Sequence, residues 1–214
     1  MHLIATLPRM FTVTESWSHI DDWLRKHAPI TYELLAPPAD PAELERVQDE
    51  MELRFPQDLV DSLRCHDGLL DNSEVYVLPE LYPLLSVAQI LQLWQEIMQV
   101  NNDLGDQSDR EDPWYHRLWI PIASVDSDSQ ILDVRDGSGR LGMHYHDQGA
   151  VFGKSPWTSL RGYLSATAEA LLNNTDVQGR FPHLDDEGEV LWVDLDNTEG
   201  WGSPLQRLPA EVSS

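Results

Sequence analysis

Four short apolar runs follow one another between residues 118 and 153, with no helical pattern between them. They read LWIPIAS, QILDVRD, LGMHYH and AVFG, and clusters of Gly, Asp and Ser separate them. Runs of this kind, divided by turn residues, are typical of antiparallel strands joined by hairpins. Because the strands are grouped and do not alternate with helices, the sequence predicts an α+β fold, not a doubly wound sheet.

Apolar residues at helical spacing dominate the chain on both sides of these runs. Helices are predicted to begin with N-caps or prolines that precede such a stripe, at Thr14, Asp40, Pro56, Ser86 and Ser155-Pro156. Gln89 completes a capping box with Ser86. Between them, SEVYVLPELYPLL predicts a short strand and a proline-bounded turn, whereas NNDLGDQSDREDP predicts a long acidic loop. Several helices should therefore pack against one sheet meander.

The length of 214 residues suits a single domain. We expect an N-terminal arm over residues 1–13, the folded domain over 14–175, and an acidic C-terminal extension over 176–214. The stretch EGEVLWVDL in the extension is predicted to add one strand.

Acidic residues outnumber basic ones by 37 to 14, which gives a formal net charge of −23. Such a chain would repel nucleic acid and anionic membranes, and it would attract a basic protein partner. Solubility alone is the simpler explanation of the same charge. A single cysteine, no signal peptide pattern and no long apolar run lead us to expect a cytoplasmic protein.

The stretch SLRCHDGLL contains the parts of a nucleophilic site, Cys65, His66 and Asp67. Consecutive helical residues point about 100° apart, so these side chains would not face one another. The pattern is better explained as the end of a helix. Gly68 is then expected at C′ with a positive φ, and His66 near the helix end could meet a free carbonyl.

Two further patterns suggest metal ligands, and neither is complete. In HYHD, His144 and His146 share one face of a strand, but a third ligand is missing. In SVDSDSQ, Asp126 and Asp128 resemble part of a calcium loop without its glycine and glutamate, so a β-turn is preferred. We therefore predict no metal, no cofactor and no catalytic residue. Trp114 beside the acidic loop is either a binding residue or a loop anchor.

The order of these signals resembles the SUKH superfamily, which includes the Smi/Knr-type cell-wall assembly regulators and bacterial immunity proteins. The resemblance covers roughly residues 14 to 175. It rests on SWSHIDDWL, LLAPPADPAELERVQDEMELRFPQDLVDSLRCHDGL, LLSVAQILQLWQEI, LWIPIASVDSDSQILDVRD and WTSLRGYLSATAEALL. The chain departs from the family pattern at Ser127 and Ser129, where the family often has glycine, and this bears on the turn type.

The resemblance implies a non-catalytic protein-binding module. Our first hypothesis is an immunity protein that neutralises a basic toxin, of nuclease or deaminase type, by direct binding. A regulatory scaffold of the cell-wall type without a toxin partner is the alternative, and a metal-dependent enzyme using His144, His146 and Cys65 is a third. The surface predicted to bind the partner consists of Asp103, Asp106, Asp109, Glu111, Asp112, Trp114, Asp126 and Asp128.

Overall fold

The computed structural model describes residues 10–70, 75–79, 82–105, 113–153, 157–194 and 206–207. The helices over these residues are α1 (Val13–His27), α2 (Pro29–Glu33), α3 (Pro41–Met51), α4 (Gln57–Leu63), α5 (Val87–Asp103) and α6 (Leu160–Asn173). The strands are β1 (Trp119–Val125), β2 (Asp128–Asp133), β3 (Arg140–Tyr145), β4 (Gly149–Phe152), β5 (Arg180–Leu184), β6 (Val190–Asp194) and β7 (Gln206–Arg207). None of the helices in these ranges is both long and apolar enough to cross a bilayer.

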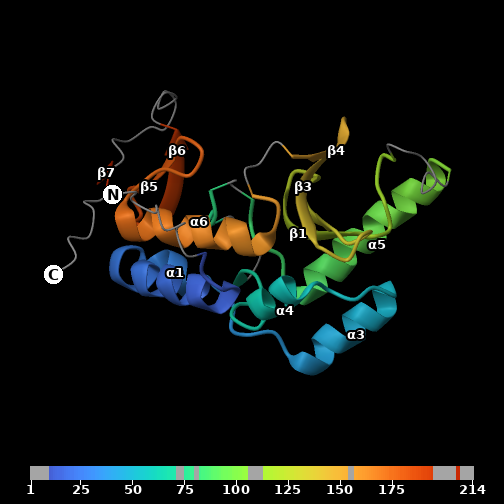
Figure 1. Ribbon diagram of the computed structural model, residues 1–214, viewed down its shortest axis with the longest axis horizontal. Helices are drawn as coiled ribbons and strands as arrows, with labels where there is room; N and C mark the ends of the chain where they lie inside the picture. The colour runs from blue at the N-terminus through green and yellow to red at the C-terminus, as the bar shows by residue number, and fades with distance from the viewer. Residues whose placement is uncertain are drawn as a thin grey trace, which may run out of the picture.

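The predicted α+β class and its strand meander are confirmed. Strands β1 to β4 form one antiparallel sheet in sequence order, and β5 lies between β6 and β7 in a second antiparallel sheet. Helices α1 and α6 run side by side, while α5 lies along the four-stranded sheet in the other half of the molecule (Figure 1). Sheet and helices thus form one connected body, which matches the single-domain expectation.

Both faces of the four-stranded sheet are covered by side chains, because successive strand residues point to opposite sides. On one face, Ile120 and Leu132 join the main core. On the other, Trp119 and Ile131 join a smaller core with Tyr115 and Ile97 of α5. This explains why the run WIPIA is apolar throughout, without alternation.

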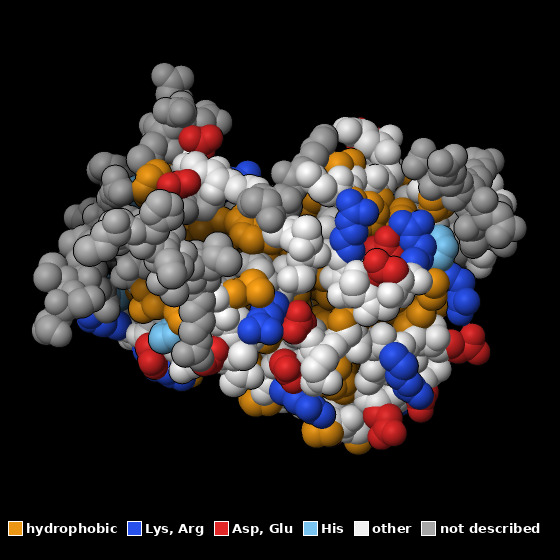
Figure 2. All heavy atoms as spheres, in the orientation of Figure 1, with side chains coloured by type: hydrophobic (Ala, Val, Ile, Leu, Met, Phe, Trp, Pro, Cys, Tyr) orange, Lys and Arg blue, Asp and Glu red, His pale blue; other side chains and the backbone are white. Residues whose placement is uncertain are grey.

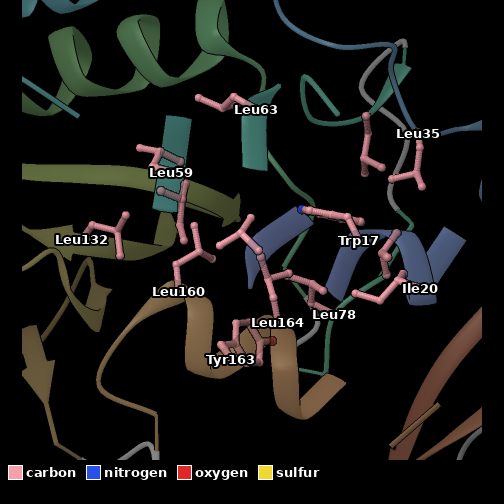
Figure 3. Close-up of a cluster of buried hydrophobic side chains, with 14 of the residues drawn as sticks. Trp17, Ile20, Leu35, Leu59, Leu63, Leu78, Leu132, Leu160, Tyr163 and Leu164 are labelled. Atoms are coloured by element: carbon pink, nitrogen blue, oxygen red, sulfur yellow. The ribbon is translucent and has the colours of Figure 1, made fainter. Parts of the chain in front are cut away.

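The main core lies where α1, α4 and α6 meet the sheet (Figure 3). Trp17 of α1 is buried, and its indole Nε1 donates a hydrogen bond to the Ser62 hydroxyl at 2.9 Å. Leu160 and Leu164 of α6 point into the same cluster as Leu59 of α4 (Figure 3). Buried indole groups generally need such a partner, so this bond also aligns α1 with α4.

Two predicted helix starts are wrong in detail. The N-cap of α1 is Thr12, not Thr14: its hydroxyl accepts from Glu15 N, and the Glu15 carboxylate accepts from Thr12 N. The last helix begins after Ser159, which caps Gly162 N, and not at Ser155-Pro156, which lies outside the described residues. In both places another hydroxyl residue competes within a few positions, and only the hydrogen bond identifies the cap.

The strand predicted in SEVYVLPELYPLL is not present in residues 75–79 and 82–83. The side chains of Trp192 and Arg180 donate to the carbonyls of Val77 and Pro79 at 3.0 and 2.8 Å. Only Leu84 forms a β-bridge, to Ala123. Distant side chains therefore bind main-chain groups that a neighbouring strand would otherwise bind.

Two more differences concern the ends of elements. Helix α5 continues to Asp103, into the segment predicted as loop, and Asn101 in this last turn is buried. The predicted added strand is present as β6, but it pairs with β5, which the sequence pattern did not indicate.

Of the predicted N-terminal arm, residues 1–9 lie outside the described part. Phe11 is held to α6, where its N–H donates to Ser165 and its carbonyl accepts from Arg161.

The stretch after α4 joins three parts of the fold, and the predicted helix end is only partly right. The helix ends at Leu63, and Gly68 is therefore not its C′ residue, although its φ is +69° as expected. The His66 ring bonds the Ala36 carbonyl and the Asp21 carboxylate, both at 2.9 Å. The Asp67 carboxylate accepts from Val87 N at 2.7 Å, at the first turn of α5. We call residues 66–68 the junction.

Gly68 is required at the junction for space as well as for conformation. A Cβ at this position would collide with the main chain of Leu85 and Ser86. Gly137 also has a positive φ, +78°, but open space surrounds its Cβ position. The two glycines therefore separate backbone strain from steric collision.

We expect Gly68→Ala to lower the free energy of unfolding by about 2 kcal/mol or more beyond the loss in Gly137→Ala. Both variants carry the cost of a left-handed alanine, and only the first also displaces the start of α5. Urea unfolding followed by tryptophan fluorescence measures the difference. Equal losses in the two variants would show that the close approach to residues 85–86 does not constrain the fold.

Candidate functional site

The β1–β2 turn contains Asp126, and Asp128 follows it as the first residue of β2. Both were predicted to bind the partner. Asp126 and Ser127 have φ values of +48° and +75°, so both central residues are left-handed, as a type I′ hairpin requires. The β-turn interpretation of SVDSDSQ is confirmed, with Ser127 in a left-handed conformation at the second central position. Ser129 lies beyond the turn, buried in β2.

A groove of about 380 Å³ opens beside this turn. One wall is a face of α5, the other is the end of β1 with its turn, and the segment 83–85 lies between them. The lining residues are Leu69, Pro83, Leu84, Leu85, Gln89, Gln92, Leu93, Glu96, Ser124, Val125 and Asp126. Its volume lies within the range of about 300 to 1,000 Å³ typical of binding pockets.

Local hydrogen bonds hold each wall in place. Leu85 N donates to Ile122 O at 3.0 Å, and Ser124 N donates to Pro83 O at 3.1 Å, so the segment 83–85 is attached to the edge of β1. The predicted capping box is confirmed: Ser86 accepts from Gln89 N, and Gln89 accepts from Ser86 N. Main-chain hydrogen bonds thus attach the segment 83–85 to β1, and a side-chain capping box fixes the start of α5.

The groove combines an apolar surface with negative charge. Leu84, Leu93 and Val125 are half-buried, whereas Glu96 and Asp126 are exposed. Among the described residues that line it, none is lysine, arginine or histidine. An apolar group that carries a positive charge would fit this surface best.

Charge by itself does not locate a site on the face drawn in Figure 2. Acidic and basic side chains lie interspersed there, with apolar side chains between them (Figure 2). Opposite charges also pair within α3, where Arg46 binds Glu50 at 2.8 Å. The groove is distinguished by its shape together with acids that meet no lysine or arginine among its described lining residues.

The predicted binding residues that the structure describes lie on different elements. Asp106, Asp109, Glu111 and Asp112 lie outside the described residues. Asp103 is exposed at the end of α5, and Asp126 lines the groove. Trp114 and Asp128 are brought together through His146: the Trp114 indole donates to His146 O at 2.9 Å, and Asp128 accepts from His146 Nδ1 at 2.8 Å.

The Asp128–His146 pair is a structural contact across the turns. Burial opposes ionisation of Asp128, but hydrogen bonds from the main chain and ring of His146 outweigh it and lower the pKa of Asp128. The same hydrogen bond raises the pKa of His146. Asp128 and Trp114 both use their polar atoms inside the chain, which favours the loop-anchor alternative for Trp114.

His144 and His146 have different environments and do not resemble a ligand pair. His146 lies exposed in the turn, and His144 is only 1% exposed between the rings of Trp114 and Tyr115. Neither ring nitrogen of His144 has a hydrogen-bond partner of good geometry in the described part of the chain. Burial lowers its pKa to about 4, against weaker opposing effects of Asp128 and a Trp114 backbone group. His144 is therefore a neutral core residue.

Cys65 lies in a separate part of the molecule, near Thr14 and Asp21 of α1. Burial, together with nearby carboxylates, raises the pKa of its thiol, which disfavours the reactive thiolate. Within the described ranges, no three or more His, Cys, Asp and Glu side chains gather where they could hold a metal ion. The residues of the enzyme alternative are thus not assembled there.

The α5 wall of the groove was missed by sequence reasoning, which considered only the buried stripe of that helix. Gln89, Gln92, Leu93 and Glu96 follow i, i+3, i+4, i+7 spacing and therefore share a second face. Leu93, an aliphatic residue outside the stripe, was the available signal. The opposite wall comes from residues about 30 positions away, which periodicity cannot connect.

We predict that His144 makes stability depend on pH. Its folded pKa lies below its unfolded value of 6.5, so the unfolded chain takes up the proton first, and stability is lost as pH falls from about 6.5 towards 4. Between about pH 7 and pH 5, the free energy of unfolding should fall by about 2 kcal/mol more in the wild type than in His144→Leu.

Urea titrations at both pH values measure this difference. His19→Gln is the control, because it removes a histidine of α1 that does not contribute to the pKa shift of His144. The interpretation fails if His144→Leu and the wild type show the same pH dependence.

The turn provides a second prediction. Ser127 occupies a left-handed conformation that costs a non-glycine residue about 1 kcal/mol. Ser127→Gly should therefore raise the free energy of unfolding by up to about 1 kcal/mol, reduced by the greater entropy of glycine in the unfolded chain. Thermal and urea unfolding test this. A clear destabilisation would mean that the Ser127 side chain has a stabilising contact of its own.

Comparison with known proteins supports the predicted family. Residues 38–165 match the sequence model of the SMI1 / KNR4 family (SUKH-1). The chain is 26% identical over 113 residues to the cell wall assembly regulator SMI1 of Saccharomyces cerevisiae, an alignment that covers 45% of this chain and 22% of that protein. It is 24% identical over 90 residues to the KNR4/SMI1 homolog of Kluyveromyces lactis, covering 39% of this chain and 17% of that protein.

The matched segment contains α3, α4, α5, the four-stranded sheet and the start of α6, together with both walls of the groove. The chain aligns with only about a fifth of the length of these two relatives. The family match itself spans more than half of this chain. The chain therefore belongs to the SMI1 / KNR4 family (SUKH-1).

Proposed function

We propose that this chain is a non-catalytic module that neutralises a basic toxin, of nuclease or deaminase type, by direct binding. The observation that carries the proposal is the net charge of −23 on a member of a SUKH-type family. A toxin that acts on nucleic acid needs a positive surface to hold phosphates, and an acidic protein can compete for that surface. The single cysteine suits a reducing compartment, and we place this function in the cytoplasm.

The binding surface predicted from the sequence remains part of this proposal. Asp103 and Asp126 are exposed and available to a partner. Asp128 and Trp114 would contribute by holding the turns in place, because their polar atoms are already bound to His146. Direct contacts should therefore come from the exposed acids more than from Trp114.

A second candidate is a regulatory scaffold of the cell-wall type. It is favoured by the name of one relative, cell wall assembly regulator. The two candidates predict different partners: a toxin encoded beside this gene in the first case, and proteins of envelope synthesis in the second. Both use the chain as a binding module without chemistry of its own.

We expect the purified chain to bind the toxin domain encoded by a neighbouring gene in a one-to-one complex. Raising NaCl from about 50 to about 300 mM should weaken the affinity about tenfold or more, because screening removes the long-range attraction. Isothermal titration calorimetry at both salt concentrations measures this. Co-expression with the toxin should also restore growth.

A catalytically inactive toxin variant serves as the binding control and separates binding from toxicity. Tight binding that does not respond to salt would contradict the electrostatic part of the proposal. Failure to bind any neighbouring toxin would contradict the immunity role and leave the scaffold as the better candidate.

A further inference from the structure

The groove between α5 and the β1–β2 turn has the dimensions and the supports of a peptide-binding site. Its walls are the face of α5 that contains Gln92 and Glu96, and the strand end at residues 124–126. The strand end is held by the main-chain bond from Ser124 N to Pro83 O, and the start of α5 is held by its side-chain capping box. A preformed groove keeps the ordering cost of the protein low when a ligand binds.

Apolar side chains give the groove a place for an aliphatic anchor. Leu84, Leu93 and Val125 come from three different segments and are each half-buried, so each still presents surface to solvent. An aliphatic side chain seated over them would bury apolar area on both partners. Burial of apolar area is a main source of affinity at small interfaces.

Acids at the rim specify the neighbour of that anchor. Glu96 and Asp126 line opposite walls of the groove, and no described lining residue carries a positive charge. Gln92 donates to Glu96 at 2.9 Å, which orients that carboxylate. A lysine or arginine next to the anchor would therefore gain two acidic partners, whereas an acidic peptide would be repelled.

Position 126 supports the same conclusion. Its φ of +48° is a conformation in which glycine or asparagine is easily accommodated. Aspartate is also among the residues that adopt this conformation readily, and here it places a carboxylate on the rim of the groove.

We propose that the groove binds an extended segment of the protein partner in which an aliphatic residue stands beside a lysine or arginine. The aliphatic side chain seats over Leu84, Leu93 and Val125, and the basic side chain pairs with Glu96 and Asp126. This inference rests on the proposed protein-binding function and names the surface and the kind of segment that it recognises.

The test uses the full chain, a random peptide library displayed on phage, and synthetic copies of the enriched peptides. Enriched sequences should share an aliphatic residue within about two positions of Lys or Arg. In Glu96→Lys combined with Asp126→Lys, the Kd of the synthetic peptide should rise about tenfold or more. Gln92→Trp, which fills the groove without changing charge, should also weaken binding.

The matched control is Glu45→Lys combined with Glu187→Lys. Both positions are exposed acids outside the groove, on α3 and in the β5–β6 turn, so the net charge changes by the same amount. This control should alter the Kd by about twofold or less. Circular dichroism and thermal unfolding verify that all variants are folded before binding is compared.

Any of three results overturns the inference. The first is no enrichment over a control selection without the protein, the second is enriched peptides without an aliphatic–basic pair, and the third is an equal loss of affinity in the groove and control variants.

Measuring the binding of the same variants to the toxin of the neighbouring gene separates the two proposals. If the groove variants bind that toxin like the wild type, the groove assignment fails and the immunity role stands. If the wild type selects peptides but binds no toxin, the immunity role fails and the groove assignment stands.

Discussion

The hydrogen bonds of the junction connect parts of the chain on which the rest of the structure depends. His66 bonds both Asp21 of α1 and the Ala36 carbonyl, and Asp67 binds the first turn of α5. Buried polar groups are costly without partners, so these contacts allow few alternative arrangements. Gly68 brings the main chain directly against residues 85–86, where α5 begins. The orientation of α5, and with it one wall of the groove, follows from this point.

The four-stranded sheet positions the opposite wall of the groove. Its edge strand β1 binds residues 83–85 through main-chain hydrogen bonds. Shortly before them in the chain, the carbonyls of residues 77 and 79 accept from Trp192 and Arg180. Behind the sheet lies the small aromatic core around Tyr115, where His144 is kept neutral by burial. The site surface is therefore rigid on one side because of a helix cap, and on the other because of a doubly covered sheet. Exposed acids are placed on this frame at little cost to the core.

Sequence reasoning was most successful where structure depends on neighbouring residues. The capping box of Ser86, the start of α3 at Asp40 and the four strands were all predicted, because hydrogen bonds and side-chain periodicity there span only a few positions. It was less successful where partners are distant. Residues 75–79 form no strand, and the Trp192 side chain binds the Val77 carbonyl there; β5 was missed because its pairing with β6 was not indicated locally.

The acidic charge, the α+β class and the family resemblance were thus determined by the sequence by itself, since composition and local periodicity are properties of the unfolded chain as well. Only the tertiary structure decided that Asp126 belongs with Glu96 in a groove, while Asp128 and Trp114 serve the turns. The physical reason is that a groove needs walls from segments far apart in the chain. Their meeting depends on packing and buried hydrogen bonds, which act only after the chain has folded.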